Sequence, residues 1–129
     1  MTTENRPKTT PASSDDKLRE AIIRNVADFE TERGVCGWRK RLITNDDTMV
    51  ANVSHLVIDD SKEHWHETMT EFYYVLSGGG DMCLDGERRP IKAGDIVVIP
   101  PGVRHTSEGE MEVLILGAPA LETEDIRFD

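Results

Sequence analysis

The chain has 129 residues, which is enough for one small hydrophobic core. Its 25 acidic residues exceed its 15 basic ones and give a formal charge of −10. No basic stripe offsets the repulsion from phosphates, which argues against a nucleic-acid partner. No apolar run reaches the length of a membrane span, and residues 1–14 lack the apolar stretch of a signal peptide. We therefore expect one cytoplasmic domain and no membrane partner.

The beginning of the chain is rich in Thr, Ser and Pro. We expect residues 1–14 to be a disordered lead-in to a domain that spans residues 15–120. Residues 15–29 have two interpretations, because Ser14 to Asp16 could cap a helix with an apolar stripe, whereas Ala21 to Ile23 equally suit an edge strand. We favour a short helix or turn that leads into a strand.

From Gly37 onward, runs of β-branched and aromatic residues alternate with turn signals. The predicted strands are residues 38–43, 49–58, 71–76, 96–99 and 111–116. The predicted turns are residues 77–81, which we expect to end a strand, then Asp85-Gly86, residues 93–95 and residues 100–102. This rhythm predicts an all-β barrel or sandwich, and the acidic residues 121–129 predict an exposed tail.

Three of the four histidines and one glutamate have a spacing that suits a metal site. His64 and His66 are two residues apart, so on a β-strand both side chains point to the same face. Glu71 opens the next predicted strand, and His105 follows a turn on a strand that returns toward the first two. Three imidazoles and one carboxylate are a typical ligand set for a divalent transition metal. The alternatives are packed core histidines, and a Glu71 that orients a ligand without touching the ion.

These residues belong to two blocks of fixed spacing. The first block comprises His64, His66, Glu71 and Gly78, and the second comprises Gly94, Pro100, Gly102 and His105. The two blocks resemble the two cupin motifs. The resemblance implies a double-stranded β-helix, or jelly-roll barrel, with the three histidines and Glu71 as metal ligands. Borderline ligands without cysteine favour Fe, Mn, Ni, Zn, Co or Cu, among which the sequence does not choose.

Several further side chains are candidates for contact with a small-molecule substrate. Tyr73 shares the strand parity of Glu71, so both are candidate catalytic residues on the metal-facing side. Arg104, Arg39 and Arg41 are candidates to bind a substrate carboxylate, because a guanidinium group binds carboxylates bidentately. The ordinary alternatives are a core tyrosine and solvated or ion-paired arginines.

Three functions stay open. The resemblance implies a metal-dependent, dioxygenase-type oxidoreductase acting on a small oxygenated substrate, a sugar or sugar-acid isomerase, epimerase or lyase, or a non-catalytic small-ligand-binding or sensory cupin. Cupins that resemble this chain are frequently dimers, and residues 38–43 offer a strand edge, so we predict a homodimer. We expect Cys36 and Cys83 to be free thiols.

Overall fold

The structure is a computed structural model that describes residues 18–129. Its strands are β1 (Glu32–Arg33), β2 (Gly37–Ile43), β3 (Asn52–Ile58), β4 (Trp65–His66), β5 (Thr70–Leu84), β6 (Glu87–Lys92), β7 (Ile96–Ile99), β8 (His105–Glu108), β9 (Met111–Ala118) and β10 (Ile126–Arg127). The helical elements of this part of the chain are two single 3₁₀ turns, η2 (Val26–Asp28) and η3 (Thr123–Asp125). None of its helices is long and apolar enough to cross a membrane.

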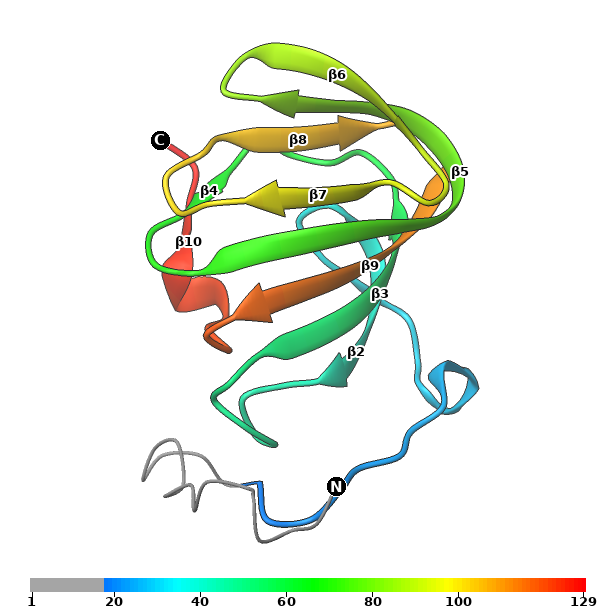
Figure 1. The fold of residues 1–129 in the computed structure, drawn as a ribbon, viewed down its shortest axis with the longest axis vertical. Coiled ribbons are helices and arrows are strands. Elements are labelled where there is room, and N and C mark those ends of the chain that lie inside the picture. The colour runs from blue at the N-terminus through cyan, green and yellow to red at the C-terminus, as the bar shows by residue number, and fades with distance from the viewer. Residues whose placement is uncertain (1–17) are drawn as a thin grey trace, which may run out of the picture.

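The strands curl into a barrel in which β5 belongs to both walls. Strands β1, β2, β3, β9 and β5 are antiparallel neighbours in that order. The first half of β5 also pairs with β7, and its second half pairs with β6 and β8. Figure 1 shows these strands stacked from β6 at the top to β2 at the bottom. The prediction of an all-β jelly-roll barrel is confirmed.

The glycine-rich stretch behaves differently from our expectation. We predicted that residues 77–81 end a strand, which is wrong, because β5 runs unbroken for 15 residues. The pairing register with β9 shifts between Val75 and Ser77, and Gly78 has a φ of 77°. A Cβ at Gly80 would lie 1.9 Å from the carbonyl oxygen of Glu108. The glycines therefore bend β5 and admit a neighbouring backbone, so that one strand passes from one wall to the other.

The other predicted turns are present. Asp85 and Gly86 have φ angles of 49° and 84° and join β5 to β6 as a two-residue hairpin, with Leu84 paired to Glu87. Residues 93–95 and 100–102 flank β7. At the N-terminal end, η2 precedes β1, which agrees with a short helix or turn leading into a strand. The predicted lead-in, residues 1–14, lies outside the described residues.

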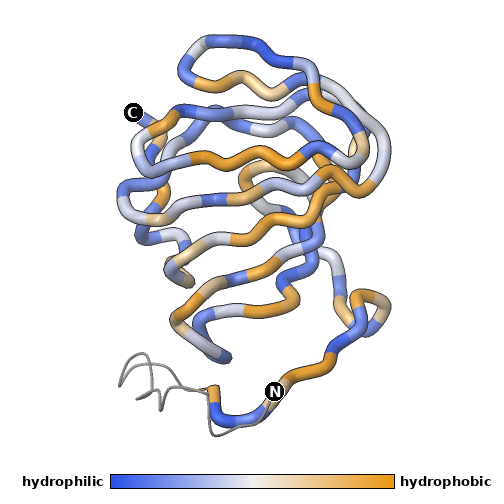
Figure 2. The backbone as a smooth tube through the Cα atoms, in the orientation of Figure 1, coloured by the Kyte–Doolittle hydropathy of each residue, from blue (hydrophilic) through white to orange (hydrophobic). Residues whose placement is uncertain are grey.

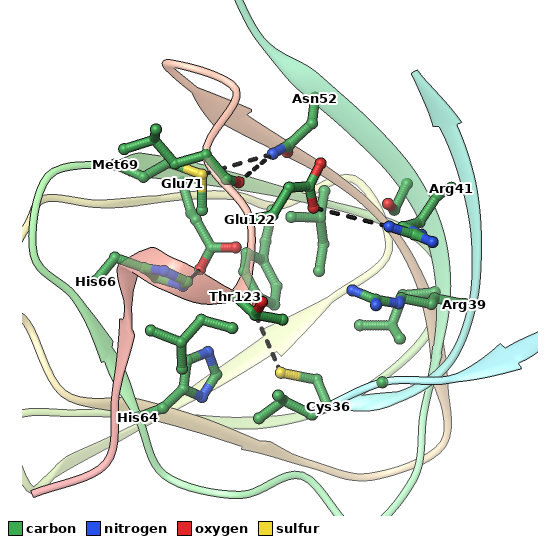
Figure 3. A pocket seen from close by; sticks show the side chains of 18 of the residues that line it. Cys36, Arg39, Arg41, Asn52, His64, His66, Met69, Glu71, Glu122 and Thr123 are labelled. Atoms are coloured by element: carbon green, nitrogen blue, oxygen red, sulfur yellow. Dashed lines mark hydrogen bonds and ion pairs between the residues drawn. The ribbon is translucent and has the colours of Figure 1, made fainter. Parts of the chain in front are cut away.

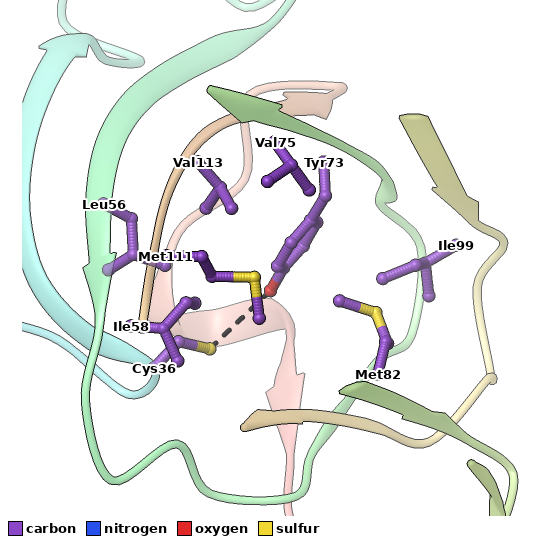
Figure 4. Packing of buried hydrophobic residues seen from close by; sticks show 9 residues of the cluster. All are labelled: Cys36, Leu56, Ile58, Tyr73, Val75, Met82, Ile99, Met111 and Val113. Atoms are coloured by element: carbon purple, nitrogen blue, oxygen red, sulfur yellow. Dashed lines mark hydrogen bonds between the residues drawn. The ribbon is translucent and has the colours of Figure 1, made fainter. Parts of the chain in front are cut away.

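The hydrophobic core fills the space between the two walls. Its least exposed members are Tyr73, Val75, Met82, Ile99 and Val113, and Figure 4 shows them converging from β5, β7 and β9. The side chains that alternate with these core residues along the strands form the outer face of the barrel. Figure 2 shows the hydrophobic residues that follow one another along β7 and β9, and Ile96 and Val98 of β7 are exposed on the outer face.

The C-terminal residues are not the exposed tail that we predicted. Strand β10 pairs with β4, with Ile126 opposite His66 and Arg127 opposite Trp65. Asp125 is buried, and its carboxylate accepts hydrogen bonds from the backbone N–H groups of Thr68 and Met69. The acidic composition misled the prediction, because a carboxylate that accepts several backbone hydrogen bonds can be buried. We refer to residues 121–129 as the C-terminal strap.

Candidate metal centre

The four predicted ligand residues meet at one end of the barrel. An isolated bridge joins His64 to His105, with backbone N···O distances of 3.1 and 2.9 Å. His66 follows on β4, and Glu71 is the second residue of β5, with its side chain inward. All four side chains are buried, and one potential ligand atom from each lies within 4.8 Å of the others. The structure thus brings together the whole set that the sequence suggested.

Glu71 occupies the middle of this group. Its Oε1 atom lies 2.9 Å from Nε2 of His66 and 3.0 Å from Nε2 of His105. The His64 ring is 4.3 Å from the His105 ring and 5.1 Å from the His66 ring, centroid to centroid. Three imidazoles therefore surround one carboxylate oxygen.

The hydrogen bonds of the group test whether these residues fit a metal ion. Nδ1 of His105 lies 2.9 Å from the carbonyl oxygen of Val103, which only accepts, so Nδ1 carries the proton of a neutral ring. Nε2 of His105 then presents a lone pair to Glu71 Oε1. Nε2 of His66 is buried and makes no hydrogen bond, although the same oxygen is close. A cation bound between these electron-pair donors would satisfy all of them, so the residues fit a divalent metal ion.

The electrostatics of the group agree with this interpretation. Burial lowers the pKa of His64 to about 4, with the neighbouring His105 acting in the same direction. Burial alone would raise the pKa of Glu71, but in the absence of metal, hydrogen bonds that His105 and His66 can donate outweigh it and hold that pKa at about 2. Near neutral pH, His64 is therefore uncharged and Glu71 is ionised, which are the protonation states that metal coordination requires.

The ligand group opens onto a cavity of about 90 Å³. Because one water needs about 10–15 Å³ by this measure, the cavity has room for several waters or one small organic molecule. Figure 3 shows His64 and His66 on one side of the cavity and Arg39 and Arg41, from β2, on the other. Glu122 and Thr123 of the C-terminal strap contribute a further wall.

The predicted substrate-binding arginines fall into two groups. Arg39 and Arg41 line the cavity, and the Nε atom of each contacts Oε1 of Glu32, at 3.0 and 2.6 Å. Arg104 is exposed and does not line the cavity; its guanidinium lies 5.8 Å from the centre of the Trp65 ring. Its parity, opposite to that of His105, directs it outward.

Tyr73 lines the cavity and is also part of the core. Its side chain is only 1% exposed, and its hydroxyl lies 3.7 Å from the sulfur of Cys36. Burial raises the pKa of Tyr73 well above its usual value, so the phenol is neutral. Tyr73 is therefore a core residue that also forms part of the pocket wall.

Sequence reasoning missed the contribution of the C-terminal strap. Glu122 has a buried Oε1 atom without a hydrogen-bond partner, and its Oε2 atom lies 3.9 Å from Arg41. Asp125 stands 3.9 Å from the His66 ring. No local pattern marks these residues, because only the pairing of β10 with β4 brings them to the site.

Comparison with protein families and known proteins agrees with this architecture. A family model described as a cupin domain matches residues 58–116, a range that contains all four ligand residues. Together with the jelly-roll barrel and the two motifs, this match shows a small cupin domain in this chain.

Two curated relatives share parts of the sequence. An uncharacterized protein of Methanocaldococcus jannaschii is 38% identical over 66 residues, which are 48% of this chain and 53% of that protein. A protein of Streptomyces cyaneus, named polyketide synthase CurC, is 30% identical over 96 residues, 70% of this chain and 61% of the relative. The aligned part of the chain thus spans little more than half the length of these relatives.

Solved structures show the same fold. A protein from Planctomyces limnophilus superposes with a TM-score of 0.80 at 25% identity, covering 84% of this chain and 97% of that one. Pac13, a nucleoside dehydratase, has a TM-score of 0.76 at 24% identity, with coverage of 85% and 92%. Ectoine synthase from P. lautus has a TM-score of 0.68 at 17% identity, with coverage of 83% and 88%. At such identities the last two demonstrate a shared fold alone.

Proposed function

We propose that the protein is a metal-dependent enzyme that acts on a small, oxygenated organic acid. His64, His66, Glu71 and His105 would hold one divalent ion of Fe, Mn, Ni, Zn, Co or Cu. The observation that carries the proposal is the buried group of facing electron-pair donors that opens onto a cavity. When bound, such an ion supplies Lewis acidity and open coordination positions for a substrate oxygen or dioxygen.

The far wall of the cavity supports an acid as the substrate. Arg39 and Arg41 bring two guanidinium groups to this wall, and guanidinium matches the planar geometry of a carboxylate. The buried Oε1 atom of Glu122 has no hydrogen-bond donor, and an unpaired buried acceptor is costly. A hydroxyl group on the ligand would donate the missing hydrogen bond. A small hydroxy acid therefore fits the polar groups of this wall. Arg104 does not line the cavity and is not part of the proposed substrate-binding wall.

Tyr73 and Glu71 are the proposed catalytic residues, with different roles. Glu71 is ionised and faces the histidines, so it can hold the ion or orient the histidines around it. Tyr73 stays a neutral phenol within the cavity wall, which suits it to donate a hydrogen bond to bound substrate. Its present partner is the sulfur of Cys36, which forms only a weak hydrogen bond that a substrate oxygen can replace.

Two reaction classes suit this site. The first is dioxygenase-type oxidation, because the ligand set leaves positions for both substrate and dioxygen. The second is lyase or isomerase chemistry on a hydroxy acid or sugar acid. This class draws support from structural neighbours such as Pac13, a nucleoside dehydratase, since removal of water is a lyase reaction.

A reconstitution experiment tests the proposal. Metal-free protein would be loaded separately with each of the six metals and offered a panel of small hydroxy acids, with oxygen uptake and product NMR recorded together. Substrate-dependent oxygen uptake supports the oxidation, and conversion without oxygen supports the lyase or isomerase. Binding without turnover would indicate the non-catalytic alternative. The matched control is the double variant His64→Ala, His66→Ala, and a protein that binds none of the metals contradicts the proposal.

A further inference from the structure

The three histidines of the metal centre are not oriented in the same way. Nδ1 of His64 contacts the carbonyl oxygen of Lys62 at 2.8 Å, and Nδ1 of His105 contacts that of Val103 at 2.9 Å. Each of these rings is thus fixed by the carbonyl two residues earlier in the chain. Such a hydrogen bond places the proton on Nδ1 and leaves Nε2 free to coordinate.

His66 does not use the equivalent carbonyl. That group belongs to His64, and it already accepts the backbone N–H of His105 at 2.9 Å. Nδ1 of His66 is buried and makes no hydrogen bond. The acidic group that faces it is Asp125, whose Oδ2 atom lies 3.9 Å away. This ring therefore needs an acceptor that its own strand does not supply.

Asp125 is firmly held in front of His66. The residue is 4% exposed, and its carboxylate accepts hydrogen bonds from the N–H groups of Thr68, at 3.0 Å, and Met69, at 2.8 Å. Its backbone carbonyl accepts a further hydrogen bond from the N–H of Glu67 at 3.1 Å. The next residue of the strap, Ile126, pairs with His66 itself. The carboxylate is thus anchored to the turn that directly follows His66.

We propose that Asp125 is a positioning residue of the metal centre, whose carboxylate accepts the Nδ1 proton of His66 and directs Nε2 of that ring toward the ion. Asp125 would do for His66 what the carbonyls of Lys62 and Val103 do for the other two histidines. Asp125 of the C-terminal strap is then part of the metal centre, and metal affinity depends on its carboxylate. This inference rests on the metal site proposed above and extends it to a residue outside both cupin motifs.

Zinc binding tests the inference without knowledge of the substrate. Groups that orient metal-bound histidines typically change metal affinity by about 10–100-fold, and we expect such a loss of Zn²⁺ affinity in Asp125→Ala. The matched control is Arg127→Ala, which removes the ion pair of the strap with Glu67 but leaves Asp125 in place. This control should bind Zn²⁺ as the wild-type protein does. Equal Zn²⁺ affinity in Asp125→Ala and wild type would overturn the inference.

A second measurement distinguishes positioning from general support of the fold. Long-range ¹H–¹⁵N spectra of the zinc-loaded wild-type protein should show the His66 proton on Nδ1. In Asp125→Ala the signals of His66 should shift, while those of His64 and His105 stay in place. A wild-type His66 protonated on Nε2 would refute the inference even if the variant does not fold. A wild-type protein that binds no Zn²⁺ would refute the metal site and the inference together, whereas unchanged binding in the variant refutes only the latter.

Discussion

His64 and His105 donate a backbone hydrogen bond to each other, at 3.1 and 2.9 Å, in a bridge that stands apart from the longer strand ladders. The backbone alone therefore fixes two metal-facing rings that are 41 positions apart in the chain (105 − 64). Glu71 is fixed independently, because its backbone pairs with Ile99 on β7 and Gly117 on β9. The strand pairing of the barrel therefore sets the positions of these site residues.

Removal of the metal should accordingly leave the fold intact. In a zinc finger the metal supplies the folding energy, whereas here a core around Tyr73, Met82 and Val113 holds the barrel together. We expect a chelator to lower the melting temperature of metal-loaded protein while its far-UV circular dichroism at 25 °C stays unchanged. Loss of the β-sheet signal on chelation would contradict a preformed site.

Substitution of the ligand histidines should remove metal selectively. We expect His64→Ala, His66→Ala and His105→Ala each to lose most of the bound metal, as measured by elemental analysis. Glu71→Gln should have an intermediate effect, because the amide keeps an oxygen but loses the charge. The control is His55→Ala, because His55 is not one of the four ligand residues. Its Nε2 atom lies 3.4 Å from Oε2 of Glu112. Stoichiometric metal in a His64/His66 double variant would exclude the assignment.

The pKa values of the site predict how the stability of the metal-free protein depends on pH. The pKa of His64 is about 4 in the folded chain and about 6.5 for an ordinary histidine, so the unfolded chain binds more protons between these values. Stability should therefore fall as the pH drops from about 6.5 to about 4, by at most roughly 3 kcal/mol from this residue. The depressed pKa of Glu71 adds a further loss between about 4.5 and about 2.

Urea unfolding across this pH range provides the measurement. The control is His64→Gln, which lacks the titrating ring and should show a flatter pH dependence between about 6.5 and about 4. Identical pH profiles for this variant and the wild-type protein would show that His64 is not responsible.

Much of this architecture was predictable because it depends on local chemistry. The period of two placed His64 and His66 on one face, and the Asp85-Gly86 hairpin followed from residues that tolerate positive φ. Two features were not predictable, for physical reasons. Gly80 is required by the close approach of a distant strand, which a single sequence does not reveal. Asp125 belongs to a segment with the composition of a solvated tail, and only its long-range pairing buries it.

The two cysteines, which are free thiols as predicted, should differ in reactivity. Cys36 is buried, and burial raises the pKa of its thiol, whereas Cys83 is partly exposed on β5. Because the thiolate is the reactive form, iodoacetamide should modify Cys83 first in the native protein. Peptide mapping at short reaction times is the measurement, and Cys83→Ser should abolish the fast phase. Faster modification of Cys36 would mean that the cavity is more open than the structure shows.

A homodimer remains our proposal for the assembly, with the contact on the outer face of the barrel, because the predicted edge of residues 38–43 is partly covered by β1. The outer face of β5 and β7 exposes Tyr74, Leu76, Ile96 and Val98, with Tyr74 directly opposite Ile96. A contiguous apolar face of this kind suits a two-fold contact with a second copy. Light scattering should report a dimer that Val98→Lys converts to a monomer, whereas Val50→Lys, at an exposed position outside this face, should not. A monomeric wild-type protein would rule the proposal out.

The bent strand β5 also has a consequence for the time course of folding. It pairs with β6, β7, β8 and β9, all of which follow it in the sequence. Strand β3 also pairs with β9, so it cannot complete its own pairing until β9 has been synthesised. A ribosome must therefore deliver residues up to Ala118 before the wall that contains β3, β9 and β5 can close. Contacts of such long sequence separation are slow to form. The nascent chain exposes its strand edges during this delay, and the proposed metal site is completed late, after synthesis of the strap that carries Asp125.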